Sequence, residues 1–199
     1  MTVSTIELES FARIQREVDF SGLSRQGAEI AARIIHATGD TEIINELVIN
    51  EDAIEKAIWG LNRQVPIIVD VAMLAAGVAK LNPLVAIHAA QDVSNTNETR
   101  SHSGMVTLLA TMAKQRPLVV VGSAPTALRA ILEQQDETTP LVVIGMPVGF
   151  VDAVESKQDL RRSRITHITN TSRRGGSPMA AATLNALFLL SQGEYRLDH

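Results

Sequence analysis

Cysteine is absent from this sequence of 199 residues. Its absence excludes disulfide bonds, thiolate nucleophiles and thiolate metal sites, and it fits a reducing compartment. Aromatic residues make up only 3% of the chain, and the formal net charge is -4. Proteins that bind nucleic acid through a basic surface or by base stacking need clustered positive charge or aromatic side chains. We therefore expect no nucleic-acid partner.

Long apolar runs are also missing. Charged residues interrupt the first twenty positions, which excludes the apolar core of a signal peptide; they include Glu7, Glu9, Arg13, Arg16 and Glu17. No later run approaches the ~20 apolar residues of a membrane span, so we expect a cytoplasmic protein with no membrane partner. Hydrophobic residues still make up 45% of the chain, which is enough for a core. The length favours a single domain over residues 1–199.

Helical and strand-like segments alternate through the second half of the chain. Strands are predicted at 67–69, 84–89, 118–121, 141–144 and 165–169, and helices at 4–18, 24–38, 51–61, 73–80, 103–115, 126–134, 152–162 and 178–191, whereas 40–49 is ambiguous. Such alternation favours a parallel sheet covered by helices on both faces. We predict an α/β fold, a Rossmann-like three-layer sandwich with a mostly parallel sheet of about five strands and an N-terminal helical segment. Ligands of such folds bind at the carboxyl ends of the strands.

A histidine and an arginine stand near the end of the second predicted helix. Ser24 is suited to cap the start of this helix, and Gly39 is suited to end it. Arg33 precedes His36 by three residues, so both side chains project from nearly the same side. An acid–base group beside a permanent cation suits an anionic ligand that needs a proton moved. The alternative is that His36 only favours the negative end of the helix dipole and Arg33 is solvated.

Two loops begin with a glycine directly after a predicted strand. In GSAPTAL, residues 122–128, free N–H groups at a helix start would suit a carboxylate or phosphate, but a turn capped by Ser123 or Thr126 explains the sequence equally well. The loop matches no nucleotide-binding motif. GMPVGF, residues 145–150, leaves little side-chain bulk near a ligand. Lys157 is predicted to belong to the polar face of the helix that follows.

The loop TSRRGGSP, residues 171–178, combines two arginines, two glycines, a serine at the expected cap position and a proline in the first helical turn. Guanidinium groups beside a helix N-terminus suit a carboxylate, so this loop is predicted to bind an anion. A weaker candidate is the polar segment around Arg100. His88 and His102 lack metal-ligand spacing, so we expect no metal site.

Five segments together resemble the precorrin-8X methylmutase family, which includes the cobalt-precorrin-8 methylmutases of cobalamin biosynthesis: RIIHATGD, NETRSHSG, GSAPTAL, VVIGMPVGFVDAVESK and RRGGSPMAAATLNAL. They occur in order over nearly the whole chain. The resemblance implies a cofactor-free isomerase that moves a methyl group between adjacent ring carbons of a tetrapyrrole. Its product would be a corrin, hydrogenobyrinate or cobyrinate. The resemblance also implies a homodimer with the site near the subunit interface.

The resemblance assigns roles to individual residues. His36 matches the family histidine that protonates or hydrogen-bonds the macrocycle, and Ser10 and Arg33 match substrate-contacting residues. The guanidinium groups of Arg100, Arg173 and Arg174 are candidate partners for substrate carboxylates. The other expected substrate-binding residues are Thr99, Ser123, Gly175, Gly176 and Ser177.

The chain departs from the family pattern in four places. It is shorter before Arg100, the NTRSAAA pattern reads NETRSHSG, Ser123 replaces an asparagine, and Gln15 replaces an arginine. These departures bear on specificity, and the sequence does not distinguish precorrin-8X from its cobalt form. Two other functions also fit the residues. One is a non-catalytic corrinoid carrier, and the other is an α/β enzyme that acts on a small phosphorylated metabolite through the loops at Gly122 and Arg173.

Overall fold

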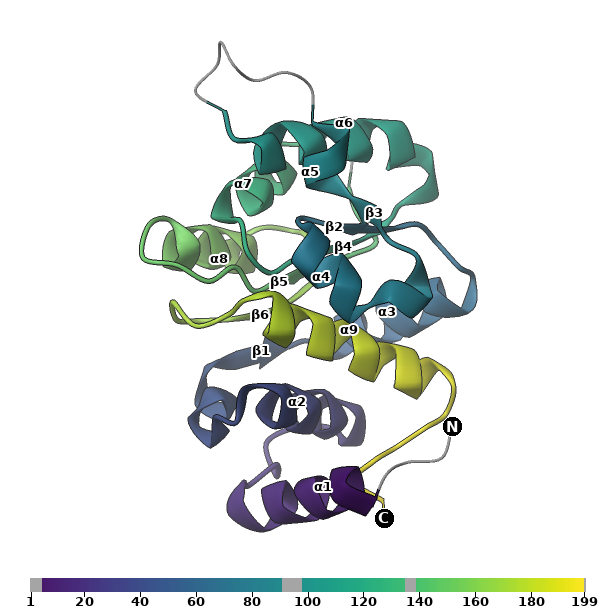
Figure 1. The fold of residues 1–199 in the computed structure, drawn as a ribbon, viewed down its shortest axis with the longest axis vertical. Helices are drawn as coiled ribbons and strands as arrows, with labels where there is room; N and C mark the ends of the chain where they lie inside the picture. Colours follow the sequence, from purple (N-terminus) through teal and green to yellow (C-terminus); the bar gives the residue numbers. More distant parts are fainter. Residues whose placement is uncertain (1–4, 91–97, 135–138, 199) are drawn as a thin grey trace.

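The molecule is built in layers. The computed structural model describes residues 5–90, 98–134 and 139–198. The shortened segment before Arg100 lies at 91–97, outside the described residues. Figure 1 shows α1 (Thr5–Glu17) and α2 (Arg25–Thr38) at one end of the molecule, α9 (Ser177–Ser191) between them and the sheet, and α6 (Arg100–Met112) at the other end.

Within the described residues, six strands form one sheet in the order β1-β6-β5-β4-β2-β3. The strands are β1 (Leu47–Ile49), β2 (Ile67–Val69), β3 (Leu84–Val85), β4 (Leu118–Val121), β5 (Val142–Gly145) and β6 (His167–Asn170). Every neighbouring pair is parallel except β1 and β6, which are antiparallel with Leu47 opposite Asn170. The predicted α/β sandwich with a mostly parallel sheet is confirmed, with one strand more than expected.

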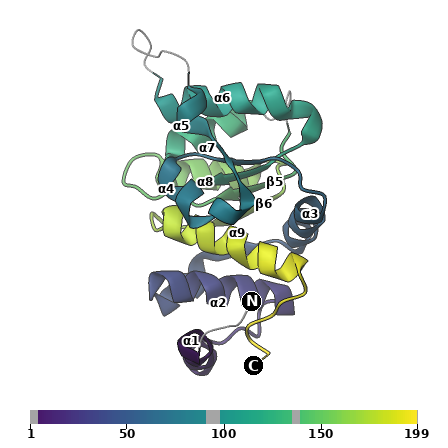
Figure 2. The same ribbon diagram turned by 45° about the vertical axis from the view of Figure 1, so that its right-hand side comes forward.

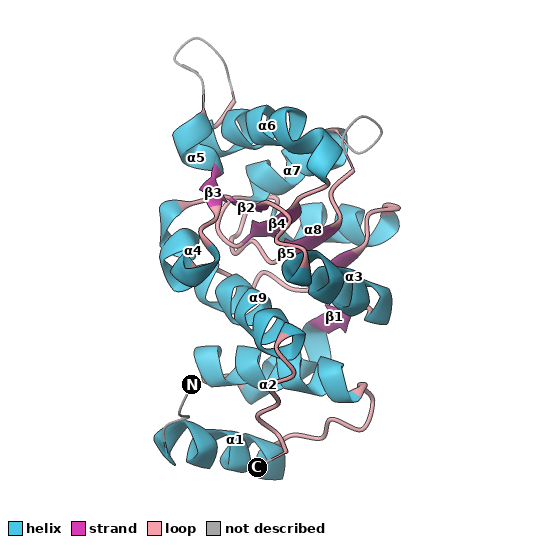
Figure 3. Ribbon diagram, turned by 90° about the vertical axis from the view of Figure 1, so that its right-hand side faces the viewer, coloured by secondary structure: helices cyan, strands magenta, loops and turns pink. Residues whose placement is uncertain are grey.

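Helices cover both faces of this sheet, as Figure 3 shows from the side. The remaining helices are α3 (Glu51–Asn62), α4 (Ala72–Gly77), α5 (Ala86–Ala89), α7 (Pro125–Glu133) and α8 (Ala153–Arg162), with 3-10 turns η1 (Thr41–Glu46), η2 (Ala79–Leu81) and η3 (Ala113–Gln115). Alternate strand residues face opposite sides. Val120 therefore joins the core formed with α2, α3, α4 and α9, and Val119 joins the core formed with α6, α7 and α8.

The layer formed by α1 and α2 reaches the sheet through α9. Helix α9 is apolar on nearly every side, as expected of a helix enclosed by protein. Figure 2 shows it lying between α2 and the sheet. The layer formed by α1 and α2 therefore packs on α9. No helix in the described part of the chain is both long and apolar enough to cross a membrane.

Two predicted boundaries are wrong. The predicted strand 84–89 pairs only over Leu84–Val85, after which the chain turns into α5 and the Ile87 N–H bonds the Asp70 carbonyl. Helix α6 begins at Arg100 rather than near Ser103, because the Thr99 hydroxyl accepts the His102 N–H and caps it earlier.

Both predicted ends of α2 are confirmed. The Ser24 hydroxyl accepts the N–H of Gly27 at 3.0 Å. Gly39 ends the helix in the left-handed region, at a φ of 67°, and donates its N–H to the Ile35 carbonyl. A side chain at that φ is strained, which accounts for the glycine. The last turn of α2, which carries His36, is thereby fixed in place.

Candidate active site

The histidine of α2 is held by two residues of α1. The Nδ1 atom of His36 lies 2.8 Å from the Ser10 hydroxyl oxygen. Its ring stacks on Phe11, with centroids 5.2 Å apart and planes inclined by 15°. A serine hydroxyl that donates to Nδ1 leaves the ring proton on Nε2. His36 is exposed, and among the described residues Nε2 has no hydrogen-bond partner, so this N–H is available to a ligand.

Arg33 belongs to the same cluster. Its guanidinium lies over the Phe11 ring, 5.0 Å from the centroid, and Nη1 donates to Glu7 at 3.0 Å. Because Arg33 and His36 both contact Phe11, they lie on the same side of α2, as the spacing predicted. Ser10, Phe11, Arg33 and His36 form what we call the histidine cluster. It places a proton donor beside a cation at the surface of the α1–α2 layer.

Asp70, at the end of β2, was not recognised as a site residue from the sequence. It is fully buried, and its Oδ2 accepts the backbone N–H groups of Gly122 at 3.2 Å, Ser123 at 2.7 Å and Ala124 at 2.8 Å. Burial raises the pKa of this carboxyl group, and the backbone N–H donors oppose that shift. An internal carboxylate therefore occupies the N–H groups that the sequence offered to a ligand anion.

The side chains of the GSAPTAL loop are also engaged. Neither Ser123 nor Thr126 caps α7, because the cap position is Ala124. The Ser123 hydroxyl instead lies 2.9 Å from that of Ser177, at the start of α9. Ser177 is buried and is not the cap of α9, a position taken by Gly176. The loops after β4 and β6 are thus joined by a serine pair.

Lys157 of α8 is the second residue that the sequence analysis misjudged. It was expected on a polar face, but it is fully buried. Its Nζ donates to Asn170 Oδ1 at 3.0 Å, to the Arg174 carbonyl at 2.8 Å and to the Ser172 carbonyl. Burial lowers the pKa of Lys157 to about 8, against an opposing effect of the Glu46 carboxylate. The ammonium group fixes the backbone of the arginine loop.

Backbone contacts join this loop to the one after β5. Gly176 donates its N–H to the Met146 carbonyl at 2.9 Å, and Gly149 donates to the Arg173 carbonyl at 3.3 Å. Gly175 has a φ of 155°, and a Cβ there would overlap the Met146 carbonyl oxygen. Gly175 and Gly176 therefore serve the close approach of two backbones, and Gly176 is buried.

The two arginines of the loop differ in their surroundings. Arg173 is exposed, with its guanidinium 5.2 Å from the centroid of the Phe150 ring. Arg174 is paired with Glu46 at 3.1 Å and with Asp40 at 3.4 Å. Asp40 follows His36 by four residues. The contacts of Arg174 thus join the strand-end loops to the end of α2, and Figure 1 shows the loops after β5 and β6 protruding on the left-hand side of that view.

Thr99 and Arg100 lie at the far end of the same edge. The Thr99 hydroxyl is 2.7 Å from that of Thr126, which brings the start of α6 to the GSAPTAL loop. Arg100 is exposed and donates to the Ile87 carbonyl at 3.1 Å. The predicted site residues therefore form three groups along one edge: the histidine cluster, the loop residues 123 and 173–177, and the pair 99–100.

Two histidines outside α2, His102 and His167, have structural partners. His102 Nε2 lies 2.8 Å from Glu133, and buried His167 places Nδ1 2.7 Å from the Ile165 carbonyl oxygen. In the described ranges, no group of three or more histidine, aspartate or glutamate side chains is arranged to hold a metal ion.

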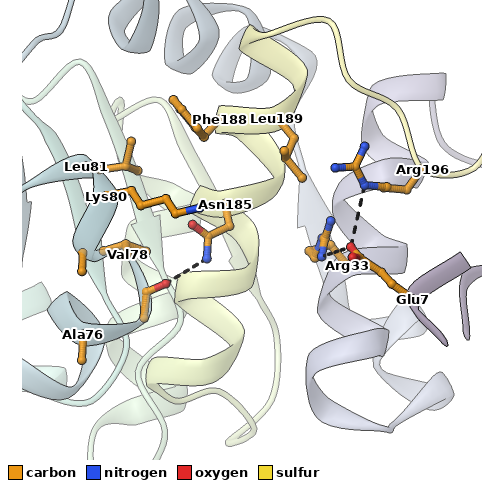
Figure 4. Close-up of a pocket in the computed structure, with 12 residues that line it drawn as sticks. Glu7, Arg33, Ala76, Val78, Lys80, Leu81, Asn185, Phe188, Leu189 and Arg196 are labelled. Atoms are coloured by element: carbon orange, nitrogen blue, oxygen red, sulfur yellow. Dashed lines mark hydrogen bonds and ion pairs between the residues drawn. The ribbon is translucent and has the colours of Figure 1, made fainter. Parts of the chain in front are cut away.

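A pocket of about 440 Å³ is lined in part by Arg33 of the histidine cluster. Figure 4 shows residues that line it. Glu7, Arg33 and Arg196 stand on one side of it, and Lys80, Leu81 and Phe188 stand on the other. Arg196 was not singled out from the sequence, because it lies far along the chain from every motif. Arg33, about one helical turn before His36, therefore lines this pocket as well as belonging to the histidine cluster.

Comparison with known proteins identifies the family of this chain. The family model for precorrin-8X methylmutase matches residues 5–190. A cobalt-precorrin-8 methylmutase from Methanocaldococcus jannaschii is 33% identical over 172 residues, which cover 83% of this chain and 80% of the relative. A precorrin-8X methylmutase from Sinorhizobium sp is 34% identical over 194 residues, which cover 89% and 90%.

A solved structure has the same fold. The precorrin-8X methylmutase from Thermus thermophilus matches with a TM-score of 0.84 at 29% identity, and the match covers 96% of this chain and 97% of that chain. The family match spans nearly all of the sequence, and the relatives align over most of their own length. The chain therefore belongs to the precorrin-8X methylmutase family, whose members are isomerases.

Proposed function

We propose that this chain moves a methyl group between adjacent ring carbons of precorrin-8X or cobalt-precorrin-8 and releases the corrin, hydrogenobyrinate or cobyrinate. The observation that carries the proposal is the hydrogen bond between Ser10 and His36 in the last turn of α2, beside Arg33. The named activities of the relatives support the same reaction.

The mechanism follows from the histidine cluster. We assign the Ser10 hydroxyl as the donor to Nδ1 of His36, 2.8 Å away, so that Nε2 presents its proton to a nitrogen of the macrocycle. Positive charge on the ring then favours migration, in which one carbon–methyl bond breaks and another forms at the neighbouring carbon. No electrons leave the substrate, so the step needs no oxidant. Arg33 stabilises the anionic edge of the ring during the shift.

The strand-end loops supply the rest of the binding surface. Arg173 and Arg100 are exposed, so their guanidinium groups are placed to pair with substrate carboxylates. Arg174 already pairs with Asp40 and Glu46, and we assign to it the placing of the loop. Ser123 and Ser177 bond each other and act in the same supporting way. A hydrogen bond from either serine to the substrate would compete with the hydrogen bond between Ser123 and Ser177.

Turnover tests the proposal directly. Purified protein is incubated with precorrin-8X and, in parallel, with cobalt-precorrin-8, and the absorption change to the corrin is followed. We expect conversion of at least one substrate, and the ratio of the two kcat/KM values identifies the preferred form. His36→Ala should reduce the rate by a factor of about 100 or more, the usual size of general acid catalysis. Equal turnover by wild type and variant would refute the mechanism, whereas tight product binding without turnover would favour a carrier.

We propose further that the active unit is a homodimer. The loop after β5 exposes apolar side chains, with Phe150 88% and Val151 83% accessible, beside Arg173. An exposed apolar patch of this kind is typical of an interaction surface. The pocket of about 440 Å³ is also small for a whole tetrapyrrole, which agrees with a site completed by a second subunit.

Phe150→Glu tests this interface. The change places a charge in the apolar patch, so we expect a dimer to monomer shift in analytical ultracentrifugation and a parallel loss of turnover. Arg161→Glu on α8, also exposed, is the matched surface control. A wild-type chain that sediments as a monomer while fully active would contradict the dimer proposal.

A further inference from the structure

The pocket beside Arg33 is chemically mixed. Its apolar lining includes Val78, Leu81 and Phe188, and its charged lining consists of three cations, Arg33, Lys80 and Arg196, with one carboxylate, Glu7. In Figure 4 the Lys80 side chain extends toward Asn185 from the wall opposite the two arginines. An apolar cavity with a few convergent charges of one sign is typical of a binding site for a small anion-bearing group.

Arg196 reaches this pocket from a strap formed by residues 194–198. Buried Glu29 of α2 accepts the Arg196 N–H at 2.9 Å and the Leu197 N–H at 2.8 Å. Gln15 of α1 donates to the Leu197 carbonyl at 2.7 Å. Arg25 pairs with Asp198 and lies over the Tyr195 ring. Because the backbone of the strap is bonded on both sides of Arg196, the direction of that side chain is fixed.

In the part of the chain that the structure describes, a buried nitrogen of the Arg196 guanidinium lacks a hydrogen bond. The side chain is only 9% exposed, and Nη2 is paired with Glu194 at 2.8 Å. Within the described residues Nε makes no hydrogen bond, and the nearest carboxylate oxygen, on Glu7, is 3.7 Å away. A buried N–H without an acceptor destabilises the folded state. Glu7 pairs with Arg33 at 3.0 Å, and it lies too far from Nε of Arg196 to accept a hydrogen bond from it.

We propose that this pocket is a subsite for a carboxylate side chain of the macrocyclic substrate, and that Arg196 binds the carboxylate together with Arg33. The inference rests on the proposed function, because it takes a carboxylate-bearing tetrapyrrole as the ligand. The ring lies over His36, and one of its acid side chains enters between η2, α9 and the α1–α2 layer. Arg33 connects the two places, since it belongs to both the histidine cluster and the pocket.

The subsite also gives a role to Gln15. The Gln15 side chain donates to the Leu197 carbonyl and so helps to hold the strap that carries Arg196.

Binding of the coloured product tests the inference. Hydrogenobyrinate and its fully esterified form are titrated into the wild-type protein and into Arg196→Met and Arg196→Gln, and binding is read from visible difference spectra. Loss of a charge-assisted hydrogen bond should raise the Kd of the free acid about 10- to 100-fold in both variants. The ester carries no carboxylate, so wild type and variants should bind it equally. Arg161→Met, on the other side of the sheet, is the control for loss of a positive charge.

Each outcome decides a separate question. Wild-type affinity for the acid in both Arg196 variants overturns the subsite, as does an equal loss for acid and ester, which would indicate a structural effect of the substitution. Failure of the wild-type protein to bind the acid also overturns it. Acid-selective binding that depends on Arg196, without turnover of precorrin-8X or its cobalt form by the wild type, upholds the subsite and refutes the proposed reaction. Thermal unfolding of each variant shows whether the fold is retained.

Discussion

Three buried charged side chains in this protein are satisfied mainly by the backbone. Asp70 accepts N–H groups of the loop after β4, Lys157 donates to carbonyls of the loop after β6, and Glu29 accepts N–H groups of the strap. Each charge therefore fixes a segment of chain that has no regular structure of its own. None of the three was identified from the sequence, because an acid after a strand or a lysine in a polar helix looks the same when it is solvated.

The histidine cluster is the opposite case. His36 and Arg33 were predicted to share one side of α2 from their spacing alone, and both contact Phe11. Ser10 came from the family resemblance, since no local pattern links it to a residue 26 positions away. Helical periodicity relates residues within one helix, whereas contacts between helices depend on the packing angle.

Lys157→Met should destabilise the fold at neutral pH. The change removes the donor of Asn170 Oδ1 and one donor from each of the Ser172 and Arg174 carbonyls, and a buried acceptor left unsatisfied costs about 1–3 kcal/mol. Chemical denaturation of both proteins measures the difference. Lys56→Met on α3, with a partly exposed side chain, is the control, and a Lys157 variant as stable as this control would contradict the prediction.

The same lysine predicts a pH dependence. Burial lowers the pKa of Lys157 to about 8, below its ordinary value of 10.5, with the Glu46 carboxylate acting in the other direction. Between these two values the unfolded chain binds more protons than the folded one, so this group makes the folded state more stable as pH rises. The stability difference between wild type and Lys157→Met should therefore be larger at pH 9.5 than at pH 7.5. A constant difference would show that the pKa is not lowered.

Ser10→Ala should slow the reaction without abolishing it. The proposed role of the hydroxyl is to hold His36 in the tautomer with its proton on Nε2. A hydrogen bond of about 1 kcal/mol corresponds to a rate factor of about fivefold. The measurement is kcat at saturating substrate, with exposed Ser21→Ala as the control. A loss as large as that of His36→Ala would mean that Ser10 takes part in the proton transfer itself.

At the scale of elements, the sequence predicts best where one local signal decides. The ends of α2 follow from Ser24 and Gly39, and the strand 118–121 follows from an uninterrupted apolar run. Strand β1 was not predicted, because three residues after a 3-10 turn give no periodicity, and pairing with β6 alone makes them a strand. The predicted strand 84–89 is wrong for a related reason: β3 pairs only with β2, at the sheet edge, and its pairing ends after two residues.

Gly175→Ala should disturb the contact between the loops after β5 and β6. The new Cβ would overlap the Met146 carbonyl oxygen, and the residue has a φ of 155°. Strain of this kind costs about 1–3 kcal/mol, so the melting temperature should fall. Gly22→Ala is the control, because a Cβ at Gly22 meets no atom within 4 Å. Equal melting temperatures for the two variants would show that the loops accommodate the new Cβ without a loss of stability.

At the scale of the whole molecule, alternation of strands and helices was enough to predict the sandwich. The position of the α1–α2 layer was not predictable, because the apolar sequence of α9 indicates burial on all sides without saying which element provides it. In the structure α2 is that element. The general rule for parallel sheets predicts a site at the carboxyl ends of the strands, where the candidate loops lie, and this location stays a prediction.

We expect residues 1–199 to unfold as one unit. Trp59 is the single tryptophan and lies in α3, so its fluorescence reports on the central sandwich, whereas far-ultraviolet circular dichroism reports on all helices. Coincident transitions by the two probes are the mark of one cooperative domain. A separate earlier transition seen only by circular dichroism would show that the α1–α2 layer unfolds independently.

The contact between α2 and α9 also has a consequence for synthesis on the ribosome. Helix α2 ends at Thr38, and the helix that covers it ends at Ser191. At about 5–20 residues per second, translation leaves the apolar face of α2 uncovered for roughly 10–30 seconds. The nascent chain therefore exposes an apolar surface early, and the helix that covers this surface is among the last segments to emerge. We expect chaperones to bind first at α2.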